Sequence, residues 1–194
     1  MYDIPTSINI DGVEYGIRNN GDFRLILDCF QALGDVELTA QERLLAALII
    51  FYVDLNTIED FNNPNLPLEQ LVSEMFNFFN CGESSVGTQT NKKLIDWQQD
   101  SQLICSAVNK VCGKEIRLEP YVHWWTFMGY FTAIGESPIS TIIGIRDKIA
   151  KGKKLEKYER QYRNENPQYF VWNNKTIEEQ EADKLVRDMW NSGG

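Results

Sequence analysis

The run from Glu119 to Phe131 constrains the fold of this chain more than any other feature. It gathers six aromatic residues around His123, the only histidine in the sequence. The rings recur at steps of three and four residues, which places them on one broad apolar stripe of a helix. Pro120 suits the first turn of that helix, and Gly135 suits the left-handed position just past its end. The run therefore predicts a buried helix with the core residues His123, Trp124, Trp125, Phe127 and Phe131.

The rest of the chain carries the signals of helices, except at its N-terminus. Apolar and polar residues alternate on both sides of Asp11-Gly12, a dipeptide that suits a type I′ turn, so residues 8–17 should form a β-hairpin. Thr39 with Glu42 forms a capping box that opens a helix. Apolar residues at helical spacing predict further helices at 23–33, 39–49, 68–79, 97–112, 139–150 and 153–166. The fold class is therefore mainly α: a compact helical domain of about seven helices with a small N-terminal β-hairpin.

The predicted domain organisation is one body followed by a terminal helix. Residues 1–170 should form a single helical domain, interrupted by a polar spacer at 83–91 that has little to bury and predicts a flexible connection. Residues 171–194 contain an amphipathic helix. Its apolar face is formed by Leu185, Val186, Met189 and Trp190. Such a face packs on its own domain, on a second copy to give a homo-oligomer, or in the groove of a partner.

Composition predicts an intracellular protein that does not enter membranes. No apolar run approaches the roughly 20 residues that a membrane helix needs, and no secretory signal is visible at the N-terminus. The four cysteines, Cys29, Cys81, Cys105 and Cys112, are widely spaced and form no C-x-x-C pair. We therefore expect reduced thiols and a cytoplasmic location.

Charge is distributed unevenly along the chain. Residues 1–80 hold three arginines against thirteen acidic residues, whereas residues 145–163 hold eight basic residues against three acidic ones. The candidate partner-binding residues of this basic segment are Arg146, Lys148, Lys153, Lys157, Tyr158 and Tyr162. Bases interleaved with tyrosines suit phosphate contact with stacking, but they also suit a solvated helix face with local ion pairs. The net charge of -9 opposes binding to nucleic acid.

The sequence lacks most catalytic constellations. One histidine excludes sites that need two, and the cysteines are not spaced for zinc. No phosphate-binding glycine loop is present. A cysteine with His123 would suffice for a thiol nucleophile and its base, although a lone histidine on an aromatic helix is more often a packed core residue. We expect no catalytic residue, no metal and no cofactor.

Several elements in order resemble a family of tailed-bacteriophage proteins named after gene product fifteen of a Listeria temperate phage. The first is Phe78-Phe-Asn-Cys81-Gly82, which is followed by a polar spacer and by Asp96-Trp97-Gln-Gln-Asp100. The next elements are His123-Trp-Trp-x-Phe127, then Ile142, Ile145 and Arg146, and finally Tyr158 and Tyr162. The resemblance spans roughly residues 8 to 170.

The resemblance implies a non-enzymatic tail-morphogenesis protein, a tail assembly chaperone that binds tape-measure or tail-tube subunits in the host cytoplasm and leaves the finished particle. The family carries no agreed catalytic residues. A structural minor tail or connector protein, retained in the virion, is the alternative. A nucleic-acid-binding accessory protein that uses the segment 146–163 is a weaker one. Virion composition and salt-dependent DNA binding distinguish the three.

Overall fold

The computed structural model describes residues 3–83 and 93–172, and this part of the chain is mainly helical, with one N-terminal hairpin, as predicted. The strands are β1 (Ser7–Ile10) and β2 (Val13–Gly16). The helices of the described residues are α1 (Phe23–Leu33), α2 (Ala40–Phe51), α3 (Leu68–Phe79), α4 (Ser101–Cys112), α5 (Trp124–Thr132), α6 (Pro138–Ala150) and α7 (Lys157–Glu165). Short 3-10 turns are η1 (Arg18–Gly21), η2 (Ile58–Asn62), η3 (Ile116–Leu118) and η4 (Pro167–Tyr169).

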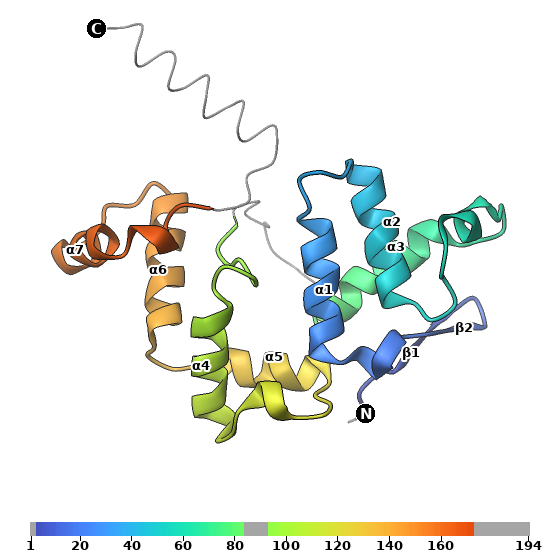
Figure 1. The fold of residues 1–194 in the computed structure, drawn as a ribbon, viewed down its shortest axis with the longest axis horizontal. Coiled ribbons are helices and arrows are strands. Elements are labelled where there is room, and N and C mark those ends of the chain that lie inside the picture. The colour runs from blue at the N-terminus through green and yellow to red at the C-terminus, as the bar shows by residue number, and fades with distance from the viewer. Residues whose placement is uncertain (1–2, 84–92, 173–194) are drawn as a thin grey trace, which may run out of the picture.

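The helices form two groups that α5 joins (Figure 1). The hairpin and α1 to α3 lie on one side, whereas α4, α6 and α7 lie on the other. Helix α5 contacts both α1 and α4, so it connects the two groups. The predicted polar spacer 83–91 falls almost wholly outside the described residues, and so does the predicted helix 176–191 with its apolar face.

The hairpin forms where the alternating pattern predicts it. Ile10 pairs with Val13 across the turn, and the two turn residues have positive φ values, 52° at Asp11 and 87° at Gly12. This is the geometry of a type I′ turn, which only residues such as Asp and Gly adopt readily. Ile17 pairs with Tyr52, so the hairpin is fastened to the end of α2.

Helix α5 is shorter than the aromatic run predicts. It begins at Trp124, not in the turn after Pro120, because His123 is its N-cap residue: His123 Nδ1 accepts a hydrogen bond of 3.1 Å from the Trp125 N–H. The other ring nitrogen, Nε2, then carries the proton and donates it to the carbonyl oxygen of Pro5 at 3.0 Å. The helix ends at Thr132, and Gly135 lies beyond its C-cap without a left-handed conformation.

Rings from three parts of the chain meet at an aromatic junction, formed by Phe23, Phe30, Trp97, Trp124 and Phe127. Phe23 of α1 stacks on Phe127 of α5 at 4.6 Å between ring centroids, and Trp97 meets Trp124 edge-on at 5.6 Å. Trp124 is only 1% exposed and Phe127 is also buried, whereas Phe131 is half-buried. The junction therefore joins the two helix groups into one core.

Two consecutive indoles also tie α5 to the end of α3. Trp124 Nε1 donates to the carbonyl oxygen of Phe79, and Trp125 Nε1 donates to that of Phe78, both at 2.9 Å. The last carbonyls of a helix have no partner within it, so the Trp124 bond satisfies the Phe79 carbonyl. The Phe78 carbonyl also accepts a hydrogen bond from the Cys81 N–H at 3.0 Å. Trp125 itself is half-buried.

All four cysteines are free thiols, as predicted. Cys29 of α1 is fully buried, and its Sγ lies 3.7 Å from the carbonyl oxygen of Ala47 in α2. Burial, with a smaller contribution from Asp28, raises the pKa of the Cys29 thiol to about 12. Cys81, Cys105 and Cys112 are half-buried.

Candidate partner-binding site

The predicted basic segment begins within α6. Ser137 is the N-cap residue of this helix and accepts a hydrogen bond from the Ser140 N–H, and Pro138 occupies its first turn. Ile139, Ile142 and Ile145 are buried, which turns one face of α6 toward the core. The same face carries Arg146, which follows Ile145 directly.

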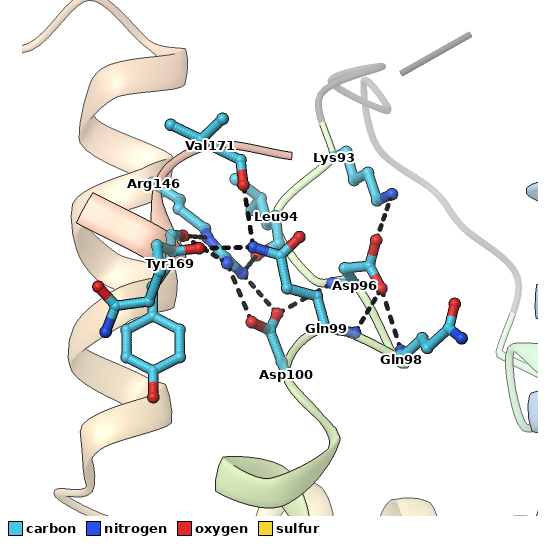
Figure 2. Close-up of polar contacts among 10 residues, drawn as sticks. Lys93, Leu94, Asp96, Gln98, Gln99, Asp100, Arg146, Tyr169 and Val171 are labelled. Carbon is cyan, nitrogen blue, oxygen red and sulfur yellow. Dashed lines mark hydrogen bonds and ion pairs between the residues drawn. The ribbon is translucent and has the colours of Figure 1, made fainter. Parts of the chain in front are cut away.

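Arg146 is a buried structural residue, which corrects its assignment to the partner-binding surface. Its side chain is 4% exposed and forms an ion pair with Asp100, with Nη1 2.6 Å from Oδ2 and Nη2 3.0 Å from Oδ1. Nη1 also donates to the carbonyl oxygen of Leu94 at 3.0 Å. Nε and Nη2 donate to that of Tyr169, at 2.9 and 2.6 Å (Figure 2). All five guanidinium N–H groups are thereby used.

The group of Arg146, Asp100 and the carbonyls of Leu94 and Tyr169 is called the Arg146 clamp below. It joins α6 to the turn before α4 and to η4, three segments that are distant in sequence. The indole of Trp172 covers the guanidinium at 4.3 Å, an arrangement that adds a cation–π attraction. The clamp therefore holds the C-terminal end of the described chain against α6.

The turn at residues 96–100 presents Asp100 to the clamp. Asp96 Oδ1 accepts hydrogen bonds from the N–H groups of Gln98 and Gln99, and Asp100 Oδ2 accepts one from the Asp96 N–H (Figure 2). Burial favours the neutral acid at Asp96, but the hydrogen bonds from Gln99 and Lys93 outweigh it and lower its pKa. The sequence predicts that this helix starts at Trp97. Because the side-chain-capped turn precedes it, α4 starts at Ser101 instead.

The break between helices α6 and α7 begins where the sequence predicts it, after Ala150. Gly152 has a φ of 66°, and the next residue, Lys153, donates its N–H to the carbonyl oxygen of Lys148 at 2.8 Å. This left-handed closure ends α6. The predicted start of the next helix at Lys153 is wrong: α7 begins at Lys157, because Glu156 is its N-cap residue.

Lys148 is also used inside the protein. Its Nζ lies 2.6 Å from Oε1 of Glu159, a residue of α7 that is 4% exposed. Glu159 also accepts a hydrogen bond from the Glu156 N–H, which makes the capping box of α7. The bond to Lys148, and then the backbone bond, lower the pKa of Glu159, and Glu159 in turn raises that of Lys148. The pair fixes α7 on α6.

Several basic side chains of α7 and of the turn before it remain exposed, together with Tyr158, which is 65% exposed. These basic side chains form no ion pair with any other residue in 3–83 or 93–172. We call this set the α7 basic surface, formed by Lys153, Lys154, Lys157, Tyr158, Arg160 and Arg163. Tyr162 is half-buried at its edge. Of the predicted partner-binding residues of the basic segment, Lys153, Lys157 and Tyr158 thus remain exposed.

The predicted partner-binding residues Leu185, Val186, Met189 and Trp190 lie outside the described residues. In the described ranges, no three His, Cys, Asp or Glu side chains are grouped as a metal site would require. No helix in those ranges is both long and apolar enough to span a bilayer.

One comparison with known proteins decides the family. A family model described as Bacteriophage Gp15 protein matches residues 1–170, a range that includes the aromatic junction, the Arg146 clamp and the α7 basic surface. The chain belongs to the bacteriophage Gp15 protein family. The match stops before Trp172, whose indole covers the Arg146 guanidinium. Neither the search of curated proteins nor that of solved structures gives a match.

Proposed function

We propose that this Gp15-family protein is a non-enzymatic tail assembly chaperone that binds tape-measure or tail-tube subunits during phage tail morphogenesis in the host cytoplasm. The observation that carries a binding role is the α7 basic surface. Five cations stand in water beside an exposed tyrosine, although acidic residues outnumber basic ones in the chain. Arg and Tyr are common in protein interfaces, whereas an unpaired cationic surface adds nothing to the fold.

The family supports the phage context, and the rigid mounting of α7 supports the binding role. The Arg146 clamp and the Lys148–Glu159 pair hold α6 and α7 in fixed positions, so a partner would not have to order this surface. Preorganised surfaces bind more tightly because less conformational entropy is lost on association.

Co-expression tests the partner. The full chain should be expressed with the tape-measure protein encoded in the same phage genome, and separately with the tail-tube subunit, and then captured by an affinity tag. We expect at least one of the two to co-purify with the chain and not with an unrelated acidic helical protein of similar size. Capture of neither partner would contradict the proposal.

Mass spectrometry of purified virions separates the chaperone from a structural tail or connector protein. A chaperone should be abundant in infected cells during tail assembly and absent from CsCl-purified particles. Stoichiometric copies in mature virions would instead establish the structural role.

A further inference from the structure

The end of the molecule opposite α7 carries the opposite charge. Six carboxylates from the hairpin, the residues after α2, η2 and the start of α3 make up this acidic end: Asp11, Glu14, Asp54, Glu59, Asp60 and Glu69. Gln70 of α3 donates to Asp11 Oδ2 at the hairpin tip at 3.2 Å, and the N–H of Gly16 donates to Asp54 Oδ2 at 3.1 Å. These contacts hold the contributing segments together.

No basic residue forms an ion pair with the acidic end within the described ranges. Arg18 lies beside it, but its guanidinium donates to the carbonyl oxygens of Ile49, Tyr52 and Leu55 and to the Asn56 side chain. The sequence from 44 to 91 contains no Lys or Arg, and none of the six carboxylates forms an ion pair with another described residue. The ion pairs in these ranges lie elsewhere, around Asp22, Asp96, Glu115 and the α6–α7 contact. The six carboxylates therefore outnumber the one neighbouring arginine, and the acidic end keeps a net negative charge.

The two charged surfaces lie at opposite ends of the long axis. In Figure 1, which is drawn with that axis horizontal, α7 marks one extreme, and the hairpin and the start of α3 mark the other. A chain arranged in this way has a large electric dipole along its length. Opposite ends of two such molecules attract each other, whereas like ends repel.

We propose that the α7 basic surface of one copy docks on the acidic end of a second copy, head to tail. Charge complementarity selects this arrangement, because a symmetric dimer through either end would place like charges against each other. The pair as a whole keeps one free end of each sign: the acidic end of one copy and the α7 basic surface of the other. The association is therefore open-ended, and it closes only where the rotation between copies forms a ring.

This inference deepens the binding role proposed above by naming an occupant for α7. In a series of docked copies, the α7 basic surface of one terminal copy stays free for a tape-measure or tube subunit. A protein that assembles in series suits a partner with repeated binding sites. The tests are nevertheless independent, because self-association is measured on the purified chain alone.

The experiment uses complementary charge reversal. Variant A carries Lys153→Glu, Lys157→Glu and Arg160→Glu, which makes both ends acidic. Variant B carries Asp11→Asn, Glu14→Lys, Glu59→Lys and Glu69→Lys, which leaves two carboxylates against three lysines at the acidic end and so makes both ends basic. Asn suits the type I′ turn at residue 11 as well as Asp does. Lys110→Glu, at an exposed position on α4 away from both ends, is the control. Circular dichroism confirms that each variant folds, and sedimentation velocity measures self-association at about 50 mM and about 500 mM NaCl.

We expect wild type and the control to form concentration-dependent oligomers at low salt that dissociate at high salt. Variants A and B should each remain monomeric. An equimolar mixture of A and B should associate again, because A then offers only acidic ends and B only basic ones. Restored association depends on the charge pairing itself, so loss of folding in one variant cannot imitate it.

Three outcomes would overturn the proposal. They are a monomeric wild type at low salt up to about millimolar concentration, oligomers that persist in A and B separately, and failure of folded A and B to associate when mixed. Salt-dependent binding of single- or double-stranded DNA that is lost in variant A, in a wild type that does not self-associate, would instead assign the α7 basic surface to nucleic acid.

Discussion

The aromatic junction and the Arg146 clamp both join distant parts of the chain, but by different physics. The junction is a set of rings in van der Waals contact, so each ring contributes roughly in proportion to the apolar area it buries. The clamp centres on one buried charge whose five N–H groups all have acceptors. Removing one ring leaves a cavity, whereas removing one clamp partner leaves an unpaired charge or acceptor. The junction should therefore weaken gradually, and the clamp should fail as a unit.

The largest effect is expected in the junction. Trp124→Ala should reduce the free energy of unfolding by about 3–5 kcal/mol, because it empties a fully buried site and leaves the Phe79 carbonyl without its donor. Trp124→Phe keeps most of the ring volume and should cost less, about 1–3 kcal/mol. Urea unfolding followed by circular dichroism measures both. Equal losses in the two variants would show that the hydrogen bond, and not the packing, holds this end of α5.

A double-mutant cycle tests whether the clamp is one unit. Arg146→Ala should cost about 3–5 kcal/mol, since Asp100 is then a buried carboxylate with no cation beside it. Arg146→Ala with Asp100→Ala should cost less than the sum of the two single changes, by about 1–3 kcal/mol. Arg146→Lys keeps the charge but loses the two-pronged contact and serves as the matched control. Additive losses in the cycle would mean that the two side chains act separately.

The Lys148–Glu159 pair at the edge of the clamp region should show itself in the pH dependence of stability. The pKa of Glu159 is lowered in the folded protein, so its contribution is complete above the ordinary value of 4.5 and is lost as pH falls through the lowered folded value. The melting-temperature difference between wild type and Glu159→Gln should therefore shrink from pH 7 toward pH 3. A difference that stays constant over that range would show that the ion pair does not stabilise the fold.

The smallest effect is expected on the α7 basic surface. Lys153→Ala and Lys157→Ala should each change the free energy of unfolding by no more than about 0.5 kcal/mol, because both side chains are exposed and have no ion-pair partner in the described ranges. Denaturant unfolding at about 500 mM NaCl, where self-association is screened, gives the intrinsic value. A loss above 1 kcal/mol would show that these lysines stabilise the folded protein, as Arg146 does.

The same contrast explains what could be predicted from the sequence. Ring spacing, the Asp11-Gly12 turn and the Thr39–Glu42 capping box are local signals, and each gave the expected element. The clamp depends on which residues the chain brings to Arg146, and charge pattern alone cannot distinguish a buried arginine from an exposed one. The Asp96-Trp-x-x-Asp100 element carried a signal, since two acids four residues apart can cap a turn and then face a cation.

The predicted starts of two helices were wrong for a related reason. The sequence places helix starts at Trp97 and Lys153. At the first, a side-chain-capped turn precedes the helix, and at the second, the capping box of Glu156 and Glu159 starts the helix at Lys157. Both features replace helical hydrogen bonds without disturbing the apolar pattern. The basic segment 145–163, by contrast, is evident from composition, and only the division of its residues into buried and exposed ones required the structure.

The alkylation rate of the Cys29 thiol measures how often α1 and α2 separate on the hairpin side of the molecule. Because burial suppresses the thiolate, an alkylating reagent at mildly alkaline pH reacts only while α1 and α2 are transiently apart. The half-buried Cys81, Cys105 and Cys112 should react earlier, so intact-mass spectrometry over time separates their labelling from that of Cys29. The rate of the last modification then reports how often this part of the protein opens, and a docked second copy on the acidic end would slow it.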